Sequence, residues 1–130
     1  MKLQKLVYFA YGWYFAYFDQ PLFGETIYAW RHGPVVADLY GHFKRYGGNP
    51  IEHISPSVRY NLNEDVISIL DEVWETYASA TDIQLSDITH RIDAPWAKVY
   101  SQYKWGADIK PLEIREYFKT LKDKFDNDPT

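Results

Sequence analysis

The apolar run over residues 3–18 constrains the fold more than any other segment of this chain. Its aliphatic and aromatic residues recur at the three- and four-residue spacing of one helical face, and further aromatic side chains fill the other faces. A helix that is apolar nearly all round has no face suited to water, so it belongs in the middle of a fold. The sequence therefore predicts a domain built around its first helix.

Length, charge and cysteine content narrow the class of protein. The chain has 130 residues, which is enough for one stable domain, and its formal net charge is −4. It has no cysteine, which excludes disulfides and Cys-based zinc sites and fits a reducing cytoplasm. The acidic balance speaks against DNA binding by this chain alone, because phosphate backbones require a basic face. The N-terminal run is too short to span a bilayer and lacks a small-residue cleavage pattern, so we expect a soluble, cytoplasmic protein.

Start and stop signals predict about six helices and a small β element. Pro21 ends the first helix, residues 26–31 have the composition of a strand, and Pro34 opens a second helix with a stripe at Val36, Leu39, Tyr40 and Phe43. Residues 51–54 are predicted to pair with residues 26–31. Four more helices are expected over residues 63–77, 81–90, 95–105 and 111–125, with Ile67, Leu70, Trp74 and Tyr77 forming the inward stripe of the first of these four.

The predicted fold class is therefore mainly α. We expect a single compact helical domain over residues 1–125, with a β-hairpin or a two-to-three-stranded sheet near the front and a disordered tail at residues 126–130.

Catalytic and metal-binding patterns are weak in this sequence. The four histidines, His32, His42, His53 and His90, have no zincin spacing, and the serines lie in no Gly-x-Ser-x-Gly context. Thr89, His90, Arg91 and Asp93 could form a catalytic cluster, but Asp93 is better explained as a helix cap. We predict no catalytic residue, no metal and no cofactor, and keep as an alternative a small hydrolase or metal-dependent enzyme that uses His90 and Asp93.

The most distinctive segment covers residues 29–35, Ala-Trp-Arg-His-Gly-Pro-Val. It is predicted to lead a strand into a helix start, where backbone N–H groups after Pro34 would favour an acidic group. Two interpretations stay open: a tight turn needed only for the fold, or a docking corner for a partner's carboxylate or aromatic side chain. The second predicts a partner-binding set of Tyr28, Trp30, Arg31, His32, Gly33, Pro34, Val35 and Asp38.

Several motifs together resemble the Panacea antitoxin domain family of SocA-like and GepA-like phage-associated proteins. They are Lys2-Leu3-Gln4-Lys5-Leu6, the Trp30-x-x-Gly33-Pro34-Val35 corner, the stretch from Leu85 to His90, and Pro95-Trp96. The resemblance covers nearly the whole chain. One difference is that similar proteins usually carry a further helical segment before the first motif.

The resemblance implies an antitoxin that neutralises a cognate toxin, encoded by the adjacent gene, by direct contact in a bacterial or prophage toxin–antitoxin pair. A proteolytic adaptor that delivers the toxin to a protease is an alternative within the family, and a repressor of its own operon is another. The resemblance implies no catalytic residues, and the oligomeric state stays undetermined.

Overall fold

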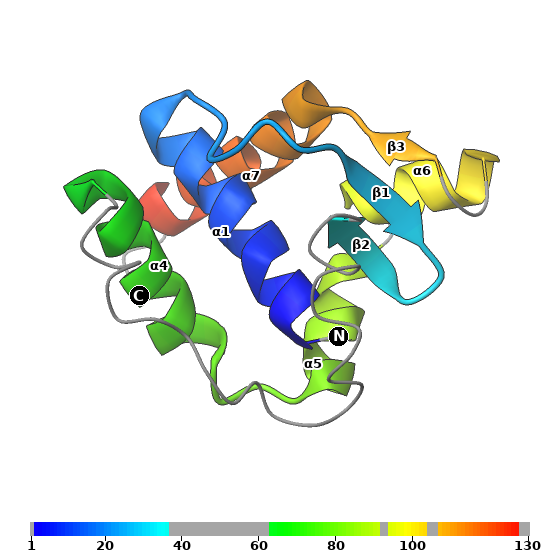
Figure 1. Cartoon of the computed structure of the whole chain (residues 1–130), viewed down its shortest axis with the longest axis horizontal. Coiled ribbons are helices and arrows are strands. Elements are labelled where there is room, and N and C mark those ends of the chain that lie inside the picture. The colour runs from blue at the N-terminus through cyan, green and yellow to red at the C-terminus, as the bar shows by residue number, and fades with distance from the viewer. Residues whose placement is uncertain (1, 37–62, 92–93, 104–106, 128–130) are drawn as a thin grey trace.

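The computed structural model describes residues 2–36, 63–91, 94–103 and 107–127. It confirms the predicted fold class, since the chain is mainly helical with one small antiparallel sheet (Figure 1). The described ranges contain five helices. The second predicted helix, from residue 37 onward, and the predicted strand at 51–54 lie outside the described residues. No helix in these ranges is both long and apolar enough to cross a bilayer.

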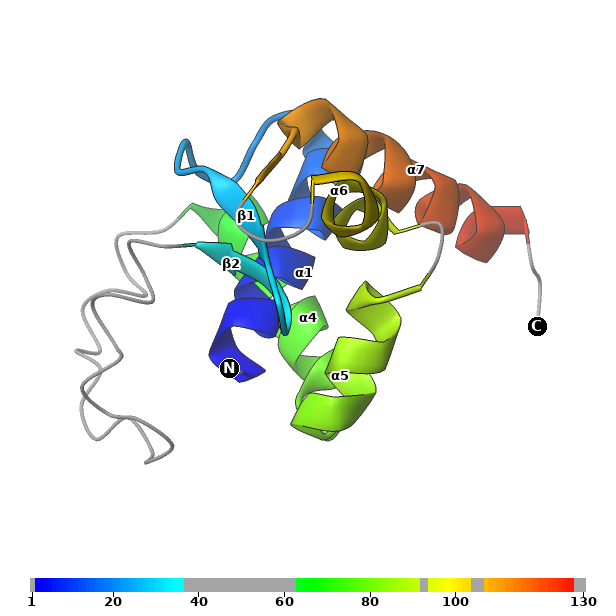
Figure 2. The same cartoon turned by 90° about the vertical axis from the view of Figure 1, so that its right-hand side faces the viewer.

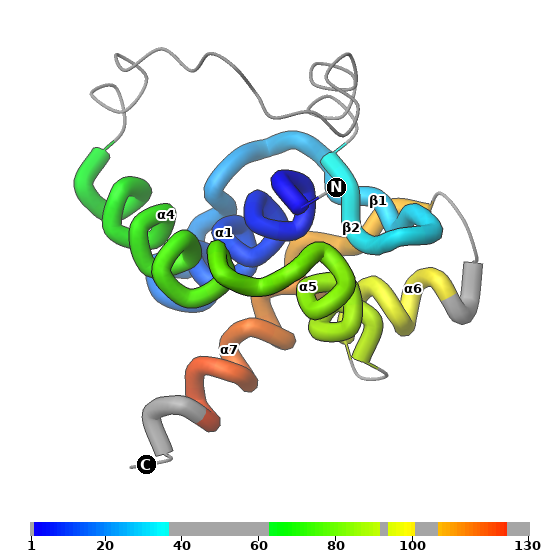
Figure 3. The backbone as a smooth tube through the Cα atoms, turned by 90° about the horizontal axis from the view of Figure 1, so that it is seen from below, coloured from blue at the N-terminus to red at the C-terminus, as the bar shows by residue number. Residues whose placement is uncertain are grey.

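Helix α1 (Lys2–Phe18) lies at the centre of the fold, as its sequence predicted. It packs against α4 (Glu64–Tyr77), α5 (Asp82–Thr89), α7 (Pro111–Asn127) and the hairpin (Figure 3). Half of its ten buried residues are aromatic, and Phe9 and Tyr11 are each only 2% exposed. Gly12 faces Phe118 of α7 so closely that an added Cβ would overlap the phenyl ring. The absence of a side chain at Gly12 therefore lets α7 approach α1.

Strands β1 (Ile27–Trp30) and β2 (Gly33–Val36) form a hairpin, to which β3 (Asp108–Ile109) adds on the other side of β1. The predicted helix start at Pro34 is wrong, because Pro34 pairs with Ala29 inside β2. Proline is tolerated there because β2 is an outer strand of the described sheet. Ile27 pairs with both Val36 and Ile109. A two-residue strand such as β3 carries too little periodicity to be predicted.

The orientation of α4 differs from the prediction. Asn63 caps the helix as expected, its Oδ1 accepting a hydrogen bond from the Val66 N–H at 2.9 Å. However, α4 buries Ile69 and Val73, while Leu70 is 37% and Trp74 64% exposed. The sequence holds two overlapping stripes at helical spacing, and the one with Ile69 and Val73 faces the core. Of the predicted stripe, Tyr77 does pack against the core, its ring stacked on that of Phe9. Periodicity alone cannot choose between two such stripes.

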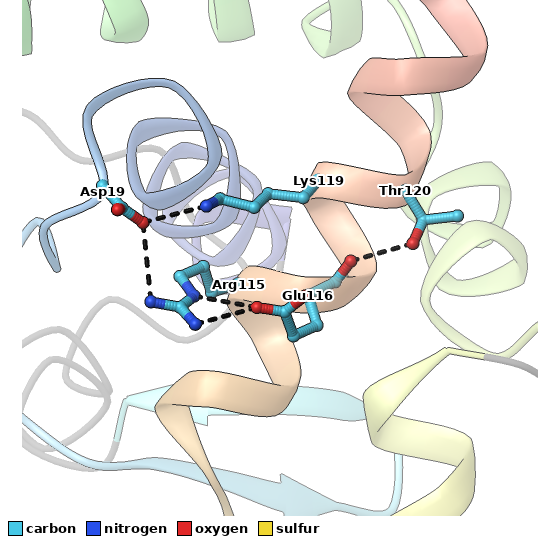
Figure 4. A network of polar contacts seen from close by, with 5 residues as sticks. All are labelled: Asp19, Arg115, Glu116, Lys119 and Thr120. Atoms are coloured by element: carbon cyan, nitrogen blue, oxygen red, sulfur yellow. Dashed lines mark hydrogen bonds and ion pairs between the residues drawn. The ribbon is translucent and has the colours of Figure 1, made fainter.

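The C-terminal helices follow their predicted signals. Thr81 and Gln84 form the expected capping box of α5, and α6 (Pro95–Tyr103) and α7 both begin at a proline. On α7, Ile114 and Phe118 are buried as predicted. Asp19, directly after α1, forms ion pairs with Arg115 and Lys119 of α7, and Arg115 also pairs with Glu116 (Figure 4). This network ties the end of α1 to α7.

Candidate partner-binding site

The predicted docking corner is the tip of the β1–β2 hairpin. Trp30 pairs with Gly33, which leaves Arg31 and His32 as a two-residue loop. Gly33 has φ +137°, a backbone conformation that residues with a Cβ rarely adopt. Arg31 and His32 are exposed, whereas Tyr28 and Trp30 are half-buried. The tip therefore presents a guanidinium and an imidazole to solvent.

Side chains from α1 and α5 lie directly beneath Gly33. A Cβ at this position would lie 3.5 Å from both Lys5 Cε and Thr89 Oγ1. Lys5 is 1% exposed, and its Nζ forms a 2.6 Å ion pair with Oδ1 of Asp82 at the start of α5. A buried ammonium group requires such a partner. The ion pair therefore joins α1 to α5 below the hairpin.

The side chain of Gln4 bonds to the backbone of Val36, which follows Pro34. The backbone N–H groups after Pro34 were predicted to bind an acidic ligand. The Val36 N–H donates to Gln4 Oε1 at 3.0 Å, and Gln4 Nε2 donates to the Val36 carbonyl at 3.2 Å. Gln4 is 5% exposed. The predicted outward-pointing N–H after Pro34 is therefore wrong at Val36, because the segment is a strand whose backbone bonds to α1.

Helix α6 lies beside the hairpin (Figure 2), and three stacked rings support the hairpin from this side. The rings of His90 and Trp96 are nearly parallel with their centroids 3.9 Å apart, and Tyr100 also stacks on Trp96, with the centroids 4.7 Å apart. Trp96 Nε1 donates a 2.6 Å hydrogen bond to the carbonyl of Trp30. The stack therefore holds the last residue of β1 and with it the hairpin tip.

The environment of His90 favours its neutral form. Burial lowers the pKa of His90, and the nearby charges of Lys5 and His32 act in the same direction, against the opposing effects of a hydrogen bond with the His32 backbone and the Asp87 carboxylate. Its Nε2 is buried without a hydrogen-bond partner among the described residues. A neutral imidazole stacks on indole without the cost of burying a charge.

The structure divides the predicted partner-binding set into two groups. Arg31 and His32 are exposed and Tyr28 and Trp30 half-exposed, so a partner could reach them. Gly33, Pro34 and Val35 are buried, and Val35 is only 1% exposed, so these three residues serve the fold. Asp38 lies outside the described residues.

The residues of the alternative enzyme hypothesis are only partly described. His90 lies against Trp96 and Gly33, while Asp93, His42 and His53 fall outside the described ranges. Within those ranges, no three histidine or carboxylate side chains gather as a metal ion would need. What the described tip offers chemically is a charged and aromatic surface that can hydrogen-bond to a carboxylate.

Local patterns do not connect Lys5, Trp96 and the adjacent pair Thr89 and His90. These residues belong to three short motifs, and the separation along the chain hides that they meet beneath one hairpin. The available signal was their residue type, since polar or ring-bearing residues within short motifs suggest specific buried contacts.

Comparisons with known proteins point in one direction. Residues 3–97 match the family model described as antitoxin SocA-like, Panacea domain. The chain is similar to Antitoxin SocA of Caulobacter vibrioides (strain NA1000 / CB15N), at 26% identity over 137 aligned residues covering 96% of this chain and 70% of the relative. No solved structure matches the chain. The matched segment of the family model contains the hairpin and the side chains beneath it.

Proposed function

This chain belongs to the SocA-like Panacea domain family of antitoxins, and from that premise we propose that it neutralises a cognate toxin by direct protein–protein contact. The toxin expected is the product of the adjacent gene. In this proposal the chain acts by binding, without a catalytic residue, metal or cofactor, and it acts in the cytoplasm.

We place the toxin contact at the hairpin tip. The observation that carries this assignment is the contrast between the exposed Arg31–His32 loop and its buried support of Lys5, Thr89 and Trp96. A loop held by buried contacts loses little conformational entropy on binding, which favours affinity. Arg31 and His32 can pair with a carboxylate, and the half-exposed rings of Tyr28 and Trp30 can act as anchors of the kind common at interface centres.

The test is the binding of the adjacent gene's product to wild-type and tip variants. Arg31→Glu combined with His32→Glu should raise Kd by at least about thirtyfold, because both cationic contacts become repulsive. Trp30→Ala should weaken binding by a similar factor. Lys124→Glu, an exposed charge reversal on α7, is the matched control and should leave Kd unchanged.

Two further readouts separate the possible failures. Thermal unfolding should give the tip variants nearly wild-type Tm, because the altered side chains are exposed or half-exposed. If the toxin neither binds the wild-type chain nor is neutralised by it in co-expression, the proposed function is wrong. If binding persists unchanged in the tip variants, only the assigned surface is wrong.

A further inference from the structure

An apolar groove lies between α1 and α4, away from the hairpin tip. Figures 1 and 3 place α4 and the hairpin on opposite sides of α1. The groove has a volume of about 500 Å³, and its walls include Trp13, Tyr17, Phe18 and Val73. Tyr17 is 52% and Phe18 37% exposed, which is high for aromatic side chains of a small domain. The groove is thus an exposed apolar surface on the described part of the molecule.

The groove is suited to apolar side chains. Trp13 Nε1 donates a 3.0 Å hydrogen bond to Tyr77 Oη, so these two polar atoms of the walls already bond to each other. The walls come from two neighbouring helices, an arrangement that accepts the apolar face of a third helix. The shape therefore favours an amphipathic helix over an extended polar peptide.

The charges around the groove determine the chemistry of that helix. α4 carries five carboxylates and no basic residue, all five are exposed, and Glu72 itself lines the groove. On the α7 side, Arg115 and Lys119 pair with Asp19 (Figure 4), and Lys122 lies 5.2 Å over the Tyr17 ring. The α4 side is therefore rich in exposed carboxylates, and this negative charge is complementary to a positively charged segment.

We propose that the groove between α1 and α4 binds a basic amphipathic helix of a partner protein. Its apolar face fills the groove, and its flanking lysine or arginine side chains pair with the carboxylates of α4. This surface is separate from the hairpin tip and opposite in charge. The chain would therefore hold two protein segments of different chemistry at once.

Three synthetic 18-residue peptides test the proposal by calorimetric titration against the full chain. The first has leucine at positions i, i+3, i+4 and i+7 with lysine on the other faces, the second replaces each lysine by glutamate, and the third scrambles the first. We expect binding of the first alone, with a Kd that rises as salt is increased, because salt screens the charge pairs. Equal binding of the glutamate or scrambled peptide would overturn the proposal.

Variants of the chain locate the binding surface. Ser68→Arg places a long charged side chain in the groove and should abolish binding of the lysine peptide, and Glu72→Lys should raise Kd about tenfold. Ile83→Ser and Glu113→Lys change exposed residues outside the groove and should bind the peptide like wild type. Equal Kd values for Ser68→Arg and Ile83→Ser would refute the groove as the site.

A second copy of the chain is the competing occupant. Sedimentation velocity of the wild-type chain and Ser68→Arg decides this: a wild-type dimer that Ser68→Arg converts to monomer would assign the groove to self-association and overturn the proposal. A wild-type monomer agrees with it. None of these measurements uses the toxin, so they stand or fail independently of the function proposed above.

Discussion

His90 illustrates how a single residue acquires its chemistry from the fold. Its ring stacks on Trp96 at 3.9 Å, its Nε2 is buried, and burial is the largest cause of its lowered pKa. An imidazolium in the same position would hold its Nε2 away from water and lie near the charge of Lys5. Protonation of His90 and folding of the chain therefore oppose each other.

We predict that the free energy of unfolding decreases as the pH is lowered from about 7 to about 5. In the unfolded chain the imidazole takes up a proton near pH 6.5, but in the folded chain only at lower pH, so the unfolded state binds more protons in this window. The stabilisation is complete above the unfolded pKa and is lost as the pH falls. Urea unfolding across this range should show a shallower pH slope for His90→Gln than for wild type or His32→Gln.

At the scale of one element, α4 shows how packing decides between two faces that the sequence makes almost equivalent. Val66, Ile69 and Val73 lie at helical spacing, as do Ile67, Leu70 and Trp74. The fold buries Ile69 and Val73 and packs Val66 partly against the core. Tyr77 also packs there, its ring stacked on that of Phe9 with the centroids 4.3 Å apart.

The two faces of α4 predict opposite mutational costs. Val73→Ala should lower the free energy of unfolding by about 2 kcal/mol, because Val73 is 5% exposed and truncation leaves a cavity. Trp74→Ala removes far more atoms but should cost less than about 0.5 kcal/mol, since Trp74 is 64% exposed. Urea unfolding of both variants measures this. A larger loss for Trp74→Ala would mean that α4 is turned the other way.

At the scale of the whole molecule, a few polar contacts join parts of the chain that lie far apart in sequence. Lys5 reaches Asp82 at the start of α5, Gln4 bonds to both backbone groups of Val36, and Trp96 bonds to the carbonyl of Trp30. Each contact ends at or beneath the hairpin. The helices therefore hold the tip in place through contacts between distant segments of the chain.

The Lys5–Asp82 pair should respond asymmetrically to mutation. Asp82→Asn leaves the Lys5 ammonium buried without its counter-charge and should cost about 2 kcal/mol, a value reduced because the Asp82 side chain is 54% exposed. Lys5→Met replaces the ammonium by an apolar group of similar length and should change stability by less than about 1 kcal/mol. Thermal and urea unfolding test both, and Glu64→Gln, also in the first turn of a helix, controls for the loss of charge there. A greater loss in Lys5→Met would contradict this account.

Local signals were enough to predict most helices but only part of the candidate site. Asn63, Thr81 and Pro111 mark helix starts that the structure confirms, because capping depends on residues within one turn. The strand at Pro34 was missed, since its pairing with β1 and its bonds to Gln4 come from residues that local patterns do not connect. Arg31 and His32 are exposed, as a docking corner requires. The burial of Pro34 and Val35 beside them was not predicted, because it depends on the same long-range contacts.

Composition, periodicity and short motifs are local properties of the chain, and they were enough to predict the mainly helical class, the central place of α1, the capped helix starts and the likeness to the Panacea family. Three features arise only from the folded arrangement: which face of α4 is buried, that residues 33–36 form a strand, and that Lys5, Thr89, His90 and Trp96 meet beneath one hairpin. These outcomes depend on packing and hydrogen bonding between distant segments, whose free energies exceed the small differences in local propensity.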